Sequence, residues 1–281
     1  MARRRVNTND VDRRLAEGRG QGRGRDYRPY LDVRDVPSTG IASRIPGRTT
    51  GRVHHVFSNI EADCFYLLDF RDEVGDVREQ FPLLPIEDTQ QIAADLGVRH
   101  PAVPRSTTPV VMTSDFVVTV RQAEGEADLA IACKPAAKLA DPRVLEKLEI
   151  ERRYWAARDV AWGVVTEREL PRPLVESIRW FVEVGGVEGV VAPERVGPLT
   201  AHLRACVVAA TDVPLADVCA AQDDRVGLTP GTCLTLVRHA LATKRWRVAG
   251  LFDGRTAVRP DLPLPPLEPG SGAMHGAEDN A

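Results

Sequence analysis

The feature that constrains this chain most is a pair of strand-forming segments joined by a polar loop. Residues 110–120 are rich in valine and threonine, and residues 128–134 form a second apolar run closed by Pro135. Between them, residues 122–127 read QAEGEA with Gly125 near the centre, which is typical of a hairpin turn. We therefore expect two paired antiparallel strands here.

The neighbouring segments predict that this hairpin belongs to a mixed sheet flanked by helices. Apolar residues at three- and four-residue steps predict an amphipathic helix over 50–70, and residues 74–84 predict a strand. Asp141-Pro142 is typical of a helix start, and a further strand is expected over 161–166. The stripe of the later helix carries Leu145, Leu148 and Trp155.

A second, smaller domain is expected after this sheet. Residues 170–255 contain short helical runs followed by VAGLF, a short strand, which together predict a winged-helix-like helical domain. Residues 256–281 are rich in proline and glycine, which predicts a disordered tail. With 281 residues, the chain is long enough for two such cores.

Bulk properties narrow the location and the partners. No run reaches the roughly 18 apolar residues of a membrane span, and the Arg-rich start lacks the apolar core of a secretion signal. We therefore expect a cytoplasmic protein with no membrane partner. The five cysteines are scattered, so ordinary reduced thiols are expected rather than a zinc site or disulfides.

The net charge of −3 conceals a basic N-terminal region. Residues 1–29 form an Arg- and Gly-rich arm that could follow a phosphate backbone, although composition alone equally allows a solvated terminus. The candidate DNA contacts are Arg19, Arg23, Arg25, Arg48, Arg52, His54 and His55. The two histidines are placed in this group because adjacent residues of one helix point apart and do not make a metal pair.

Two carboxylates stand at positions that ordinarily carry apolar side chains. Glu61 lies on the apolar stripe of its helix, where it must be paired, protonated or metal-bound unless it reaches solvent at the helix edge. Asp115 interrupts a valine-rich strand, and a turn centred between Glu124 and Gly125 puts it opposite Lys134. A structural salt bridge in the sheet is the alternative explanation for this pair.

Two carboxylates and a lysine form the set used by metal-dependent phosphodiesterases. The carboxylates can hold Mg²⁺, which polarises the phosphate and lowers the pKa of a bound water, and the lysine can stabilise the charge that develops on phosphorus. We expect Mg²⁺ as cofactor, with two ions, and Mn²⁺ as a possible substitute.

The words around these residues carry a family resemblance. They are DYRPYLDVRDVPSTG, RTTGRVHHVFSNIEADCFYLLDF, VGDVREQFPLLP, VMTSDFVVTV and RVLEKLEIERRYWA. The chain resembles the TnsA family, endonuclease subunits of heteromeric cut-and-paste transposases, from about residue 18 to 169. The resemblance implies a restriction-endonuclease-like PD-(D/E)xK core over 30–167, with Glu61, Asp115 and Lys134 at its catalytic positions. It also implies that the protein cuts the 5′ ends of the element on double-stranded DNA at the transposon ends. The implied protein partners are a TnsB-like recombinase and a TnsC-like ATPase.

One departure from related nucleases concerns the metal ligands. Where they place Glu or Gln two residues before the lysine, this chain has Ala132, so the backbone carbonyl of Cys133 and water would complete the metal shell. Gln80 and Glu149 are possible additional site residues. Because of Ala132, a catalytically inactive adaptor is kept as an alternative, and an independent restriction-like nuclease as another.

Overall fold

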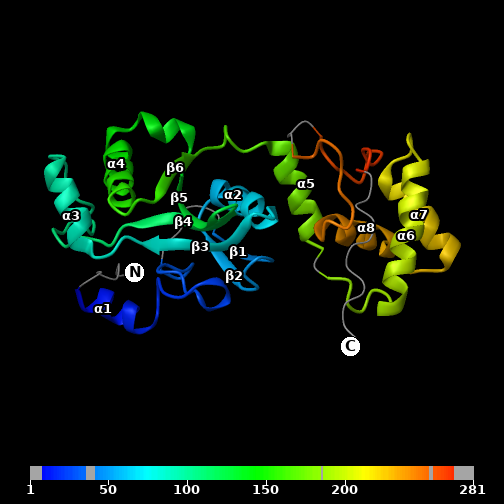
Figure 1. Ribbon diagram of the computed structural model, residues 1–281, viewed down its shortest axis with the longest axis horizontal. Coiled ribbons are helices and arrows are strands. Elements are labelled where there is room, and N and C mark those ends of the chain that lie inside the picture. The colour runs from blue at the N-terminus through cyan, green and yellow to red at the C-terminus, as the bar shows by residue number, and fades with distance from the viewer. Residues whose placement is uncertain (1–7, 36–41, 185, 253–255, 269–281) are drawn as a thin grey trace. The chain divides into compact units, whose positions relative to one another are not determined.

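The computed structural model describes residues 8–35, 42–184, 186–252 and 256–268. It divides into two compact units, residues 1–170 and 171–281 (Figure 1). The elements of the first unit are α1 (Thr8–Ala16), η1 (Gly24–Asp26), β1 (Ser43–Pro46), β2 (Val53–Val56), α2 (Asn59–Phe70), β3 (Val74–Pro82), α3 (Ile86–Asp95), β4 (Thr113–Gln122), β5 (Gly125–Cys133), η2 (Ala136–Ala140), α4 (Pro142–Ala156) and β6 (Ala161–Val165). Those of the second are α5 (Arg172–Val182), α6 (Pro193–Ala209), α7 (Leu215–Val226) and α8 (Thr232–Ala242).

A mixed sheet with the order β3-β4-β5-β6 organises the first unit, as the sequence predicts. The β3/β4 and β4/β5 pairs are antiparallel, whereas β5 and β6 are parallel. The predicted hairpin is confirmed, but its register is not: Gln122 pairs with Gly125, so the turn holds residues 123 and 124. Continuing this register places Asp115 opposite Ala132 rather than Lys134. A shift of two residues leaves every side chain on its predicted face, because side chains alternate along a strand.

Alternation along β4 fills a core on each face of the sheet. Phe116 and Val118 pack with α2 through Phe65, which is fully buried. Val117 points the other way, into a cluster with Tyr154 and Trp155 of α4. The sheet therefore lies between α2, which carries Glu61, and α4, which carries Glu149 and Glu151.

The helix predicted over 50–70 is shorter than expected. Residues 53–56 form β2, which pairs with β1, and the helix begins at Asn59 with Ser58 as its N-cap. The segment VHHV buries every second side chain, His54 and Val56, and this period of two identifies a strand. His54 and His55 are therefore on a strand, and their placement in one helix is wrong.

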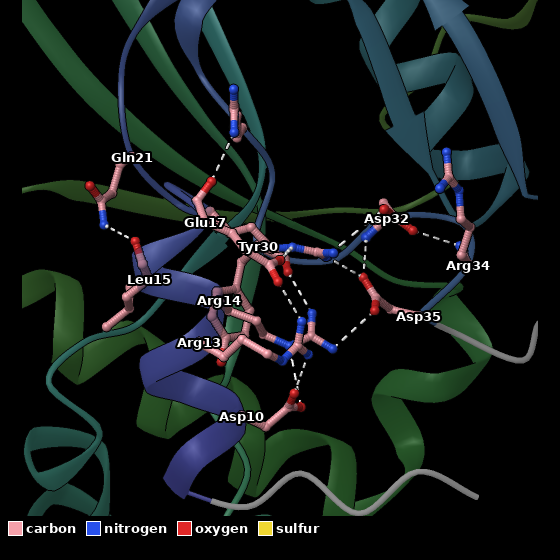
Figure 2. A network of polar contacts seen from close by, with 12 residues as sticks. Asp10, Arg13, Arg14, Leu15, Glu17, Gln21, Tyr30, Asp32, Arg34 and Asp35 are labelled. Carbon is pink, nitrogen blue, oxygen red and sulfur yellow. Dashed lines mark hydrogen bonds and ion pairs between the residues drawn. The ribbon is translucent and has the colours of Figure 1, made fainter.

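The described part of the basic arm is folded rather than free. Arg14 of α1 is buried and donates to the Tyr30 carbonyl (2.8 Å) and to Asp35 (3.0 Å). Figure 2 shows this network, in which the carboxylates of Asp10 and Asp35 form ion pairs with arginines of α1 and of the turn that follows it. Tyr27 is also buried, and its hydroxyl donates to the Glu79 carbonyl of edge strand β3 (3.1 Å). The arginines of this region are thus partly used to attach it to the sheet.

The second unit is helical, with α8 packed against α5, α6 and α7. The predicted VAGLF strand is wrong, since Val248 makes an isolated bridge with Leu267 and the residues after it form turns. The expectation of a disordered tail does not hold for residues 256–268, because Val258 is buried and its N–H donates to Ser177 Oγ. Residues 269–281 lie outside the described residues. Within the described ranges, no helix is long and apolar enough to cross a membrane.

Candidate active site

Glu61 is held at the start of α2 by a capping box. Its side chain accepts from the Phe57 N–H (2.9 Å) and from Ser58 Oγ (2.9 Å), while its own N–H donates to Ser58 Oγ (3.1 Å). The residue is only 6% exposed, so it does not reach solvent at the helix edge. Burial, reinforced by repulsion from Asp115, raises the pKa of Glu61 to about 7. A second carboxylate therefore lies nearby.

Asp115 and Lys134 form the predicted pair across β4 and the end of β5. Asp115 Oδ2 accepts from Lys134 Nζ (2.7 Å) and from the Cys133 N–H (2.7 Å). Lys134 Nζ also donates to the Cys133 carbonyl (2.9 Å), the backbone group expected to bind metal. Burial disfavours the charged lysine, but Asp115 outweighs it and raises the pKa of Lys134 above its ordinary value. The lysine is thus fixed in its cationic form.

Gln80 lies within this group of residues. Between the pairs Glu79↔Phe116 and Phe81↔Ser114, it stands opposite Asp115 in the β3/β4 ladder. Its φ of +49° is unusual for a residue other than glycine. The side chain donates to Glu61 Oε2 (3.4 Å) and accepts from Thr113 Oγ1 (3.2 Å). Since Gln80 is 3% exposed, the half-exposed strand position that ordinarily explains such a residue does not apply.

The carboxylate that α4 contributes is Glu151, not Glu149. Glu149 is partly exposed, and Arg152 and Arg153 hold its pKa at about 2. Glu151 is buried and accepts from Ser114 Oγ (2.6 Å). Burial and the charge of Asp115 raise its pKa to about 7. The sequence contained the signal, because Glu151 lies between Leu148 and Trp155 on the apolar stripe of this helix.

The donor set fits a hard divalent cation in charge and in atom type. Three buried or largely buried carboxylates, Glu61, Asp115 and Glu151, interact electrostatically with Lys134, whose one positive charge cannot neutralise all three. Oxygen donors of this kind suit Mg²⁺ and Mn²⁺. Ala132 is fully buried and its methyl group supplies no ligand. Across the described residues, no ready-made metal cluster of three His, Cys, Asp or Glu side chains occurs, so protein ligands alone do not complete a shell.

Two of the predicted DNA contacts are buried structural residues instead. His54 is fully buried and joins Thr50 Oγ1 (2.7 Å) to Glu79 Oε2 (2.8 Å). Arg52 makes a bidentate pair with Glu79 (2.8 and 2.6 Å) and also donates to the Gly24 and Val77 carbonyls. Neither side chain is available to DNA. Long-range pairing with a buried glutamate removes them from the surface, which residue type alone did not reveal.

The other predicted contacts differ in how free they are. Arg19 is paired with Asp35 (2.6 Å), and the ring of His55 accepts from the Val33 N–H (3.4 Å), with its pKa lowered by burial. Arg23, at 62% side-chain exposure, lies within 4.0 Å of Glu126 and 3.7 Å of Asp128. Arg25 and Arg48 are exposed. Arg23, Arg25 and Arg48 thus remain the candidates for a DNA surface.

Comparison with known proteins identifies the family to which the chain belongs. Residues 71–167, which include Gln80, Asp115, Lys134 and Glu151, match the family described as TnsA-like endonuclease N terminal. Over 234 residues the chain is 41% identical to the transposon Tn7 transposition protein TnsA of Escherichia coli, covering 83% of this chain and 82% of that protein. The similarity extends well beyond the matched domain. The chain therefore belongs to the TnsA family of transposition endonucleases.

Proposed function

We propose that this protein hydrolyses one phosphodiester bond at each end of its own transposon, on the 5′ strand, with Mg²⁺ as cofactor. The observation that carries the proposal is that three carboxylates withdrawn from solvent, Glu61, Asp115 and Glu151, all act electrostatically on Lys134, which pairs directly with Asp115. Uncompensated buried negative charge is costly unless a metal ion or a proton neutralises it. A phosphate-cutting site needs such charge to hold its metal ions.

In this proposal, Glu61 and Asp115 would hold the Mg²⁺ ions, with the Cys133 carbonyl and water as further ligands. When bound, the cation neutralises phosphate charge and lowers the pKa of the attacking water. Lys134 Nζ, which Asp115 orients, turns from the Cys133 carbonyl to donate to a phosphate oxygen. Gln80 and Ser58 fix the direction of the Glu61 carboxylate.

The proposed organisation is a restriction-endonuclease-like core over 30–167 and a winged-helix-like domain over 170–255. Among its described residues the core offers no obvious base-reading helix, so a TnsB-like recombinase would supply recognition of the ends. A TnsC-like ATPase is the proposed partner of the helical unit, whose α7 carries Asp217 and Asp224 on a surface unfavourable to phosphate.

A strand-specific cleavage assay tests this proposal. A duplex containing the end of the element, labelled separately on each strand, is incubated with the full-length protein, with and without the recombinase, in Mg²⁺ and in chelator. Glu151→Gln and Glu149→Gln form a matched pair, because both remove one carboxylate from α4. The first should lose 5′ cutting and the second should keep it, since Glu149 faces solvent beside Arg152 and Arg153.

Each other outcome has a distinct meaning. Cutting by the wild-type protein alone would favour an independent nuclease, and no cutting with a fully active recombinase would favour the inactive adaptor that Ala132 suggests. Equal activity of the two glutamine variants would contradict the proposed site. Cutting that persists in chelator would contradict the role of Mg²⁺.

A further inference from the structure

A hairpin outside the catalytic cluster has an unusual charge composition. Residues 96–114 contain no aspartate or glutamate, although the whole chain has 40 acidic residues. The same stretch carries Arg99 and Arg105, together with several serines and threonines. A positively charged segment with hydroxyl groups has the chemistry of a phosphate contact.

This segment is built as a rigid projection. Ala102 and Pro109 form a bridge, the Val103 N–H donates to the Thr108 carbonyl (2.9 Å), and the Val110 N–H donates to the Pro101 carbonyl (3.1 Å). Prolines at 101, 104 and 109 further restrict its backbone. At the tip, residues 104–107 are exposed. The hairpin thus holds its tip in one position in solvent.

Arg105 occupies a tip position where glycine is expected. The Ser106 N–H donates to the Val103 carbonyl (3.0 Å), which closes a four-residue turn with Pro104 second and Arg105 third. A turn with proline second and a positive φ third ordinarily has glycine or asparagine there, and Arg105 has φ +62°. Within the described ranges, its guanidinium has no ion-pair partner. Among the described residues, this arginine is therefore kept at a strained backbone position without a carboxylate partner.

The hairpin leads directly into the catalytic strand. Met112 accepts from the Leu83 N–H (2.8 Å), Thr113 donates to Gln80, and Asp115 follows. Ten residues separate Arg105 from Asp115, so the two lie at most about 35 Å apart. This span is about one turn of duplex DNA. Arg105 is thus within reach of the DNA that flanks a phosphate bound at the site.

We propose that the hairpin of residues 101–110 is a DNA clamp, in which Arg105 binds a backbone phosphate within one helical turn of the cut. The proposal rests on the proposed function, since it requires DNA at the catalytic cluster. An arginine fork recognises phosphate with two parallel hydrogen bonds, and a rigid turn limits the entropy lost when it does so. The contact positions the duplex and carries no sequence information.

Arg105→Gly separates this role from a structural one. Glycine suits the positive φ, so the variant should fold with an equal or higher melting temperature. Cleavage of end DNA in the presence of the recombinase should nevertheless fall about tenfold, with a salt dependence of binding less steep by about one in the log–log slope. Arg105→Lys, which keeps the charge, should retain more cleavage. Arg152→Ala is the matched control, because it also removes an exposed arginine of the first unit. Its partner Glu149 remains paired with Arg153 in this variant.

Neutral methylphosphonates, placed one at a time in the duplex, identify the contact. A methylphosphonate at one position should slow cleavage by the wild-type protein about tenfold. The same substitution should slow cleavage by Arg105→Gly less than about twofold, because this variant already lacks the contact with that phosphate. Equal slowing of both proteins at every position would overturn the clamp, as would undiminished cleavage or a lower melting temperature for Arg105→Gly. A wild-type protein that cuts no end DNA would instead overturn the proposed function, and the clamp with it.

Discussion

Replacing Glu79 by glutamine would test the buried network that attaches β2 to β3. Glu79 is fully buried and accepts from Arg52, His54 and the His55 N–H. Burial opposes its ionisation, but the hydrogen bonds from His54 and Arg52 outweigh it and lower the pKa from 4.5 to about 2. At about 1.4 kcal/mol for each tenfold change in proton affinity, this corresponds to roughly 3 kcal/mol of stability at pH 7. Breaking a buried ion pair from one side costs a similar roughly 3–5 kcal/mol.

The pH dependence has a definite sign. A carboxyl group whose pKa is depressed by folding stabilises the protein above its unfolded pKa, near 4.5 here, and loses this effect as the pH falls through about 2. The difference in free energy of unfolding between wild type and Glu79→Gln should therefore shrink from roughly 3 kcal/mol at pH 7 to roughly 1 kcal/mol at pH 3. Urea unfolding at the two pH values measures it. Glu126→Gln, an exposed carboxylate 4.0 Å from Arg23, should change stability by less than about 0.5 kcal/mol. A Glu79 variant as stable as wild type, or a gap that stays constant with pH, would refute the reasoning.

Three further predictions concern the site and the helical unit. Lys134→Ala should eliminate cutting through loss of charge at the transition state, and calorimetric titration should show that it weakens metal binding much less than Asp115→Ala does. Ser58→Ala should destabilise the protein by about 1 kcal/mol and slow cutting, because Ser58 both caps α2 and directs Glu61; normal cutting at reduced stability would limit Ser58 to the cap. Deleting residues after Pro171 should sharply weaken binding of the regulatory ATPase and preserve most affinity for end DNA. A pull-down in which the truncated protein captures as much ATPase as the full-length protein would contradict this.

The local parts of the site could be predicted from the sequence. Turn chemistry and alternation placed Asp115 and Lys134 on one face of a hairpin, and helical spacing placed Glu61 on a buried stripe. The register was two residues off because Gly125 begins β5 instead of occupying the turn. The predicted ion pair between Asp115 and Lys134 forms despite this error, because the long lysine side chain spans the two-residue offset and its Nζ lies 2.7 Å from Asp115.

The parts that sequence reasoning missed depend on contacts between distant segments. Arg52 and His54 look like surface residues until Glu79, 27 and 25 positions away, places them in the core. Gln80 donates to Glu61 from a backbone position with a positive φ, which no glycine in the sequence indicated. Glu151 was the exception. Its spacing from Leu148 and Trp155 in the sequence indicated a buried position, but the prediction named the partly exposed Glu149 instead.

Strand-specific cleavage by Asp115→Ala tests the central claim most directly. The full-length variant is combined with the recombinase partner on labelled end DNA in Mg²⁺, and both strands are followed. Removing Asp115 takes away a metal ligand and the direct partner of Lys134, but Glu61 and Glu151 still act on that cation and are relieved of repulsion from Asp115, so the fold should remain intact. The account predicts that 5′ strand cutting falls more than about 100-fold while the recombinase still cuts the 3′ strand. Cutting of the 5′ strand at the wild-type rate would contradict it.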